Sequence, residues 1–516
     1  GKTINTEMLE NEVELGFTCE QVKQLLITNG LPEQRELTTM RIVSELIPKK
    51  IPSIIFDFSG NWSKIIPLFQ NTDYKDSVLL FQLGHSFSLE LLSSEMDYDP
   101  ENIEYLNLFY DVFALAFKEQ KRTVDLLKIA VKNNENMSLS SLELDQKMEK
   151  EFVKKSDYSS LITILQGFID WRKFFISHSL KHEHEINTID FIKNDKTIII
   201  DLSLLEEVSQ KLFVSFVIVS KLIHYAKYFD DFQPKNIVIP YIDLFFDAYF
   251  IDNDKNSMDY GKINKFLAPL LQKGFGFIFS ANQIHYLHHN VLNYLPNIIS
   301  FKAADKRDIA MLKNQMNLQE LHGTGYYSSK RNNTYQIDYL MNLQEQEVII
   351  KRSDVNQPFP GIIGYKEISQ LDSPSQAEII SYMKRQGYDL EDHEQRIIAR
   401  AKQTLFEKDL GIYVEFMEDI ISFLGAISKF DKVGGLTESK LKEELLKYVR
   451  ITASKRVQGS KKITELRNSI FQILKTQGYL VEDHPRRASG GESIITCYKV
   501  GNKYRKAVDD LYRVRG

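Results

Sequence analysis

Short apolar runs rich in Ile, Val, Leu and Phe alternate along this chain with segments of helical periodicity. Seven runs of this kind occur up to residue 303, at 25–30, 51–62, 75–84, 196–205, 235–240, 274–282 and 297–303. Runs as apolar as "KNIVIP" and "GFGFIFSAN" are typical of strands that are covered on both faces. Strands that alternate with helices predict a mostly parallel sheet flanked by helices, which places the chain in the α/β class.

Two segments interrupt this alternation. Residues 100–185 carry Leu, Lys, Glu and Phe at helical spacing, as in "EYLNLFYDVFALAFKEQ", and they lack the turn residues that separate strands. They predict an α-helical insertion. Residues 210–229, "QKLFVSFVIVSKLIHYAKYF", are apolar on more than one helical face, so they predict a long buried helix.

The pattern changes after about residue 366, where helical segments dominate. From residue 431 onward we expect two helices followed by a hairpin, "LVEDHPRRASGGESIITCYKVG", with a Gly-rich bend between two β-prone runs. Helices followed by a two-stranded wing are typical of a winged-helix module. Such modules bind nucleic acid or dock on proteins, so both roles stay open.

Composition excludes several classes of protein. A chain of 516 residues with 43% hydrophobic and 26% charged residues is typical of a globular protein with about two to four domains. No apolar run approaches the roughly 18–20 residues that span a membrane, and the first sixteen residues hold no apolar stretch that would predict a signal peptide. The two cysteines, Cys19 and Cys497, support neither a disulfide framework nor a metal site, and we expect a reducing cytoplasm.

The net charge of −5 is unevenly distributed. Residues 451–516 hold 14 Lys and Arg against 6 Asp and Glu, a net charge of +8, so the other 450 residues carry −13. A basic end on an acidic body favours an anionic partner, with double-stranded DNA the first candidate, although a solvated basic tail would give the same count. The cations expected to contact phosphate are Arg456, Lys461, Lys462, Arg467, Arg486, Arg487, Lys503, Arg505 and Lys506.

Several runs occur in an order that resembles a known family. They are "IIFDFSGNW", "SVLLFQLG" followed by "FSLELL", "GFGFIFSAN" and "VLNYLPNIISFK", and together they extend over roughly residues 20–365. This order is similar to that of the HerA-like family, in the FtsK/HerA branch of RecA-type ATPases, whose hexameric rings pump double-stranded DNA. The resemblance rests on order and spacing, and it implies a RecA-like fold and an oligomeric ring.

The phosphate-binding loop of that family has a poor counterpart here. About 22 residues separate the family's loop lysine from the aspartate of the next strand, and counting back from Asp57 gives Arg35. Asn29 and Gln34 then take the places of the first and last glycines, and Glu36 takes that of the Ser or Thr. Glycines let backbone N–H groups close around phosphate, and the hydroxyl holds Mg²⁺. Of the loop's functional groups only the positive charge remains, as Arg35, which favours a degenerate phosphate-binding loop. The alternative is that this turn never bound phosphate.

The family's other site motifs have also lost their functional groups. The family reads roughly "VIDEAHLFF" where this chain reads "VIPYIDLFF". Pro240 therefore stands at the Mg²⁺-ordering aspartate and Tyr241 at the water-activating glutamate, unless a shift brings Asp243 nearer. The Thr-Gln pair is replaced by Ala281 and Asn282. We expect a RecA-type fold with no catalytic residues and no cofactor, and ATP with Mg²⁺ only if the chain is an active translocase.

Three polar clusters lie outside these motifs. "HSLKHEHE" places His178, His182 and His184 close together, but it lacks supporting ligands, so a solvated helix end is favoured over a metal site. "HYLHH" holds His285, His288 and His289, for which a polar surface cluster is favoured over a contact with DNA or a ligand. "GYYSSKRNNTYQ" at 325–336 mixes aromatic and basic residues and predicts a β-hairpin, with a contact to nucleic acid as the less favoured alternative.

Together these observations predict a catalytically inactive HerA-like subunit that acts as a structural or DNA-engaging part of a DNA-processing or defence complex. A nuclease or another complex subunit is the expected protein partner, within a homo- or hetero-oligomeric ring and without a membrane. The alternatives are an active DNA translocase with a non-standard site and a protein-docking scaffold. The expected parts are a RecA-like domain (1–99 and 196–365), a helical insertion (100–195), a helical connector (366–430) and a basic winged-helix-like module (431–516).

Overall fold

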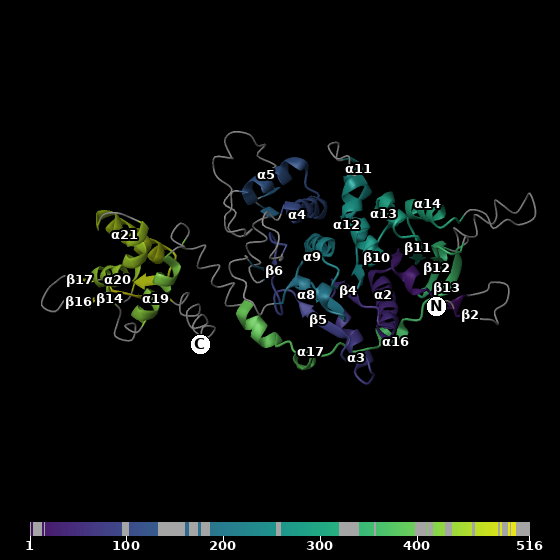
Figure 1. Cartoon of the computed structure of the whole chain (residues 1–516), viewed down its shortest axis with the longest axis horizontal. Coiled ribbons are helices and arrows are strands. Elements are labelled where there is room, and N and C mark those ends of the chain that lie inside the picture. The colour runs from purple at the N-terminus through teal and green to yellow at the C-terminus, as the bar shows by residue number, and fades with distance from the viewer. Residues whose placement is uncertain are drawn as a thin grey trace, which may run out of the picture. The chain divides into compact units, whose positions relative to one another are not determined.

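We describe the chain from a computed structural model, shown in Figure 1. The described residues are 2–3, 13–14, 16–94, 103–132, 160–161, 163–164, 174–176, 186–253, 260–318, 340–355, 358–397, 410, 416–428, 436–456, 460–482, 486–487, 494–495 and 497–501. The chain divides into two compact units, Gly1–His393 and Glu394–Gly516. Each unit has its own hydrophobic core.

A sheet of eleven strands forms the centre of the first unit as far as the structure describes it. Seven neighbouring strands run parallel, in the order β11 (Asn297–Ser300), β3 (Gln24–Thr28), β10 (Gly276–Ala281), β9 (Asn236–Ile239), β4 (Ser53–Asp57), β8 (Thr197–Asp201) and β5 (Val78–Gln82). These are the seven apolar runs of the sequence, and every residue of β4, β8, β9 and β11 is buried. The predicted α/β class is therefore confirmed.

The order of five of these strands defines the kind of α/β fold. Numbered along the chain, β3, β4, β9, β10 and β11 lie side by side in the order 5-1-4-3-2. That order is the arrangement of the RecA-type core, so the fold implied by the resemblance is present. The turn after β3 lies where a phosphate-binding loop would be.

An antiparallel extension continues the sheet beyond β11. It consists of β12 (Glu347–Lys351), β13 (Phe359–Ile362), β1 (Lys2–Thr3) and β2 (Val13–Glu14). The sequence did not predict these strands, because β1 and β2 are two residues long and "EVIIK" and "FPGI" mix polar or proline residues with apolar ones. They extend the sheet away from the parallel block that carries the candidate site.

Helices and short turns of helix connect these strands and pack on the sheet. They are α1 (Cys19–Val22), α2 (Pro32–Leu46), η1 (Ile47–Lys49), η2 (Trp62–Ile65), α3 (Ile66–Phe69), α8 (Thr188–Lys193), α9 (Val208–Tyr228), α10 (Ile242–Phe245), α11 (Ala248–Asn253), α12 (Tyr260–Gln272), η5 (Ile284–Tyr286), α13 (His289–Asn293), α14 (Lys306–Gln315), α16 (Lys366–Ser369) and α17 (Gln376–Arg385). The predicted buried helix is confirmed as α9, where the Phe216 ring stacks on Phe245 with 3.7 Å between centroids. On α17, the Tyr382 hydroxyl donates to the Val78 carbonyl of β5 at 2.7 Å.

The predicted insertion is helical over most of the residues that the structure describes there. It contains α4 (Ile103–Phe117) and α5 (Lys121–Lys132), and α4 packs along α9. One detail was wrong, since β7 (Phe175–Ile176) pairs in parallel with β6 (Leu89–Glu90). A strand of two residues is too short to show a period of two in the sequence. His178, His182, His184 and the hairpin expected at 325–336 lie outside the described residues.

The second unit contains the two predicted helices and the predicted hairpin. Its elements are α19 (Met417–Ser428), β14 (Leu436–Thr437), α20 (Glu438–Arg456), α21 (Ser460–Thr476), β15 (Leu480–Glu482), β16 (Arg486–Arg487), β17 (Ile494–Ile495) and β18 (Cys497–Val500). β15 pairs antiparallel with β18, and β14 adds a third strand that the sequence did not predict. Phe471 and Leu474 of α21 lie in the core of this unit.

Across both units, none of the helices in the described ranges combines the length and the apolar character needed to cross a membrane.

Candidate functional site

The candidate site lies at the carboxyl edge of the parallel strands. Neighbouring parallel strands end at the same edge, so the loops after β3, β4, β9 and β10 meet there. These loops and the first turn of α2 bring together all eight positions that the sequence assigned to a degenerate nucleotide site. They are Asn29, Gln34, Arg35, Glu36, Asp57, Pro240, Tyr241 and Asn282.

The loop after β3 is too short to surround a phosphate group. β3 ends at Thr28 and α2 begins at Pro32, which leaves three loop residues. The helix begins early because proline suits the first helical position and the Gln34 side chain accepts a hydrogen bond from the Leu31 N–H at 2.8 Å. Gln34 also donates to the Glu345 carbonyl at 2.7 Å, so it fixes the loop instead of leaving room for a ligand.

Arg35 fills the inside of this loop. Its guanidinium is buried, with the residue only 2% exposed, and Nη1 donates to the carbonyls of Asn29 at 2.9 Å and Gly30 at 2.8 Å. Nη2 donates to Oδ1 of Asn282 at the end of β10. Asn29 and Gly30 both have positive φ, of 60° and 64°, and in this conformation their carbonyls accept from Arg35. The loop thus offers acceptors to a cation where a phosphate-binding loop offers N–H donors to an anion.

Asp243 balances the charge of Arg35. This aspartate is 2% exposed and accepts hydrogen bonds from the backbone N–H groups of Asn282 at 3.1 Å and Gln283 at 3.2 Å. Burial raises the pKa of its carboxyl group, whereas these two N–H groups and the Arg35 charge act in the opposite direction. Asp243 is the carboxylate of the segment "VIPYIDLFF", and it binds the backbone of the loop after β10.

Asp57 organises the loop after β4. Its Oδ1 accepts from the N–H groups of Ser59 at 2.9 Å and Gly60 at 2.8 Å, and its Oδ2 accepts from that of Trp62 at 3.0 Å. Burial, followed by repulsion from Asp201 on the neighbouring strand, raises the pKa of Asp57 to about 7. This carboxylate holds a turn together.

Pro240 and Tyr241 follow β9 directly. Pro240 has no side-chain donor or acceptor, and Tyr241 takes a left-handed conformation with φ of 57° at the start of α10. The Tyr241 ring stacks on Phe58, with 6.0 Å between centroids and 18° between planes. Neither residue supplies a carboxylate that could hold Mg²⁺ or activate water.

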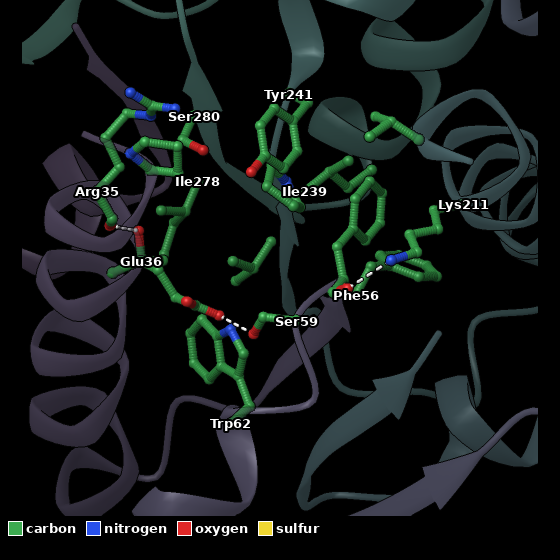
Figure 2. Close-up of a pocket in the computed structure, with 16 residues that line it drawn as sticks. Arg35, Glu36, Phe56, Ser59, Trp62, Lys211, Ile239, Tyr241, Ile278 and Ser280 are labelled. Atoms are coloured by element: carbon green, nitrogen blue, oxygen red, sulfur yellow. Dashed lines mark hydrogen bonds between the residues drawn. The ribbon is translucent and has the colours of Figure 1, made fainter. Parts of the chain in front are cut away.

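Glu36, the next residue of α2, is half-buried and faces the loop after β4. Its carboxylate accepts a hydrogen bond from the Ser59 hydroxyl, as Figure 2 shows. Burial raises the pKa of the carboxyl group, and the bond from Ser59 opposes that change. A carboxylate at this position would repel a phosphate.

A cavity of about 160 Å³ lies between α2 and the ends of β4, β9 and β10. Rings of Phe58, Trp62 and Tyr241 and the aliphatic side chains of the strands form most of its wall, and Arg35, Glu36 and Lys211 supply charge (Figure 2).

Two polar residues near this edge were not predicted as site residues. Lys211 donates from Nζ to the Phe58 carbonyl at 2.7 Å, and Asp201 accepts from the Gln82 side chain at 2.7 Å and the Ser203 N–H at 2.8 Å. The run "IIID" ends β8 with Asp201 as "IIFD" ends β4 with Asp57, and that repeat could have identified Asp201. Nothing in the sequence distinguished Lys211 within its helix.

These features do not fit a bound nucleoside triphosphate with Mg²⁺. The loop has three residues, its carbonyls face inward to a cation, and no described group of three or more His, Cys, Asp or Glu side chains is placed to hold a metal ion. We therefore derive no chemical step through ATP.

The histidines of "HYLHH" are not the surface cluster that was expected. His288 is 2% exposed and its Nδ1 accepts from the Asn290 N–H at 3.2 Å, which caps α13. His285 Nδ1 lies 2.8 Å from Oδ1 of Asp308, whose carboxylate also accepts from the His285 N–H at 3.0 Å. The two side chains serve local structure, and His289 alone is exposed.

The nine basic residues proposed for DNA contact lie in the second unit. Arg467 on α21 is half-buried and donates to Asn468 at 3.0 Å, while Arg486 and Arg487 form β16, which pairs with β17. Arg456 lies in α20, and Lys461 and Lys462 lie in α21. Lys503, Arg505 and Lys506 lie outside the described residues.

No protein-family profile matches this sequence, and no curated protein matches it. Among solved structures, the chain is similar to VirB4 of Thermoanaerobacter pseudethanolicus, with 12% identity, a TM-score of 0.46, and coverage of 67% of this chain and 91% of VirB4. It is also similar to the bacterial conjugative coupling protein TrwB in an unbound form, with 6% identity, a TM-score of 0.45, and coverage of 69% and 87%.

A third similar structure is the genome packaging NTPase B204 from Sulfolobus turreted icosahedral virus 2 in complex with AMP. It has 11% identity, a TM-score of 0.24, and coverage of 34% of this chain and 72% of B204. Likenesses at these scores carry no conclusion about site residues or activity.

Proposed function

We propose that this chain is a RecA-type subunit that does not hydrolyse ATP and that serves as a structural, DNA-engaging part of a DNA-processing or defence assembly. The observation that carries the first half is the position of Arg35. Its guanidinium donates to the two carbonyls of the loop after β3 and to Asn282, and thereby takes the space and the polarity that a triphosphate needs.

Two further observations support an inactive site. Pro240 and Tyr241 stand where the resemblance places the Mg²⁺-ordering and water-activating carboxylates, and Asp243 nearby is bound to backbone N–H groups. Hydrolysis needs a positioned metal and an oriented water together, so losing both disables it.

The proposed contact with DNA rests on the second unit. Residues 451–516 carry a net charge of +8, and α19, α20 and α21 followed by the β15–β18 hairpin have the order of elements of a winged-helix module. Phosphate contacts dominate non-specific DNA binding and carry no base information, so we expect binding without strong sequence preference.

Steady-state phosphate release from the full chain, with and without double-stranded DNA, tests the inactive site. We expect no release above that of an Arg35→Ala variant prepared in parallel, because a contaminating ATPase would appear equally in both. DNA-stimulated release by wild type that a folded Arg35→Ala variant lacks would instead favour an active ATPase with a non-standard site, as the translocase alternative requires.

A protein-docking scaffold is the second candidate function, because winged-helix modules also dock on proteins. A DNA titration of the full chain at low salt separates the two functions. Binding supports the DNA-engaging role, whereas absence of binding at low salt leaves the scaffold role in its place.

A further inference from the structure

The cavity beside Arg35 has features that the proposed function does not use. It measures about 160 Å³, and it lies between α2 and the carboxyl ends of β4, β9 and β10 (Figure 2). Exposed Ser59 and half-buried Glu36 lie in its wall, so the cavity has a side that solvent can reach. A cavity of 150 Å³ with apolar walls accepts benzene, so this one has room for a small ring system.

Its wall is mainly aromatic and aliphatic. The rings of Phe58 and Tyr241 lie nearly parallel and form one stretch of wall, and Trp62 contributes a third ring. Val238, Ile239 and Ile278 of the strands add aliphatic surface. Flat aromatic ligands gain both apolar contact and ring stacking against such a wall.

The two cations of the wall already have partners. Arg35 donates to three acceptors and faces Asp243. Lys211 donates to the Phe58 carbonyl, and it lies in the field of the carboxylates of Asp57 and Asp201. The cavity therefore has no uncompensated positive charge for an anionic ligand, and a cationic ligand would have to leave water for a mainly apolar wall.

The Glu36 carboxylate, to which the Asn61 side chain donates, is the acceptor among the charged groups of the wall. It receives a hydrogen bond from the Ser59 hydroxyl, and an ionised carboxylate has about four acceptor sites. A bound molecule that carries an N–H or O–H group could fill another of them.

We propose that this cavity binds a small, uncharged, planar aromatic molecule of one or two rings whose N–H or O–H group donates to Glu36. This ligand site lies at the same edge of the sheet as the inactive nucleotide site and deepens the proposed function. It rests on the proposed function because ATP must not compete for the cavity. A subunit without catalysis would in this way retain a ligand-responsive site.

Indole and indene form the matched pair of probes, because they share size and shape and only indole carries an N–H group. We expect the full chain, titrated calorimetrically without nucleotide, to bind indole about tenfold more tightly than indene, since a hydrogen bond to a charged acceptor contributes roughly that factor. In Glu36→Met the preference falls to about one, because the acceptor is gone.

A filled cavity provides the second arm of the test. Ser280→Leu places a larger side chain from β10 in the wall, and we expect it to weaken indole binding at least tenfold with an unchanged thermal melt. Ser280→Val replaces it if the melt falls. Three outcomes would each overturn the proposal. Wild type and the filled variant could bind indole equally well, or wild type could show no binding up to the solubility of indole. The third outcome is a preference for indole that survives Glu36→Met. None of these outcomes alters the phosphate-release result, so the two proposals fail separately.

Discussion

Replacement of Arg35 by methionine separates a structural role of this residue from a catalytic one. Methionine keeps most of the volume and removes the guanidinium, so the carbonyls of Asn29 and Gly30 and the Asn282 side chain lose their donor. Asp243 loses the positive charge that opposes its burial. We expect a large loss of stability in the first unit.

The size of the loss follows from the burial of Arg35. The guanidinium donates to three acceptors, and the buried carboxylate of Asp243 also loses the field of a positive charge. Each orphaned acceptor costs about 1–3 kcal/mol unless water reaches it, and the rims of this loop are exposed enough for water to reach some of them. We therefore expect Arg35→Met to lower the free energy of unfolding by about 3–5 kcal/mol.

Urea unfolding followed by tryptophan fluorescence measures this loss in the right unit. The chain has two tryptophans, Trp62 and Trp171, and both belong to Gly1–His393. Arg41→Met on the same helix is the matched control. Its guanidinium is exposed and pairs with Glu45 at 2.8 Å, so its loss should cost less than about 1 kcal/mol. An Arg35→Met variant as stable as the control, or more stable than wild type, would show that Arg35 is a strained functional residue and would refute the reasoning.

Three further predictions concern pH, DNA and assembly. The pKa of Asp57 is about 7 in the fold against 3.8 ordinarily, so the folded state binds this proton more tightly. The unfolding free energy should then fall as pH rises from about 4 to about 7, by at most roughly 4 kcal/mol from this group, and an equal pH slope in Asp57→Asn would contradict the assignment. If about four cations contact phosphate, the logarithm of the DNA affinity should fall against that of salt with a slope of roughly −3.6, and joint Arg486→Glu and Arg487→Glu substitution should flatten it by about half. Unchanged affinity in that double variant would favour protein docking. In mass photometry we expect a ring, alone or with native partners, and a 60 kDa species under every condition would reject it.

The parallel half of the sheet could be predicted from the sequence because its strands are buried on both faces. Runs such as "SIIFD" and "TIIID" are apolar throughout, and no helix of ordinary amphipathic period would place every residue inside. The antiparallel strands β1 and β2 were missed because two-residue strands owe their conformation to their pairing partners, which the local sequence does not identify.

The location of the site could be predicted, but its bonding could not. The sequence assigned Arg35 and Asn282 to one site, and the structure places them at one edge of the sheet because the loops after neighbouring parallel strands meet there. The Arg35 side chain turns inward because the carbonyls of Asn29 and Gly30 accept from it. The direction of those carbonyls follows from positive φ at both residues, which the sequence does not reveal. The burial of His288 likewise depends on a cap to α13 that spacing alone does not reveal.

Single-turnover hydrolysis is the measurement that tests the inactive site most directly. Full chain in excess over γ-labelled ATP, with Mg²⁺ and double-stranded DNA, would detect even a single slow turnover of the added ATP. The structure of the loop around Arg35 predicts labelled phosphate at the level of the protein-free reaction, equally for wild type and Arg35→Ala. Phosphate released by wild type and lost in an Arg35→Ala variant that urea unfolding shows to be folded would show that the guanidinium serves catalysis, and it would contradict the account.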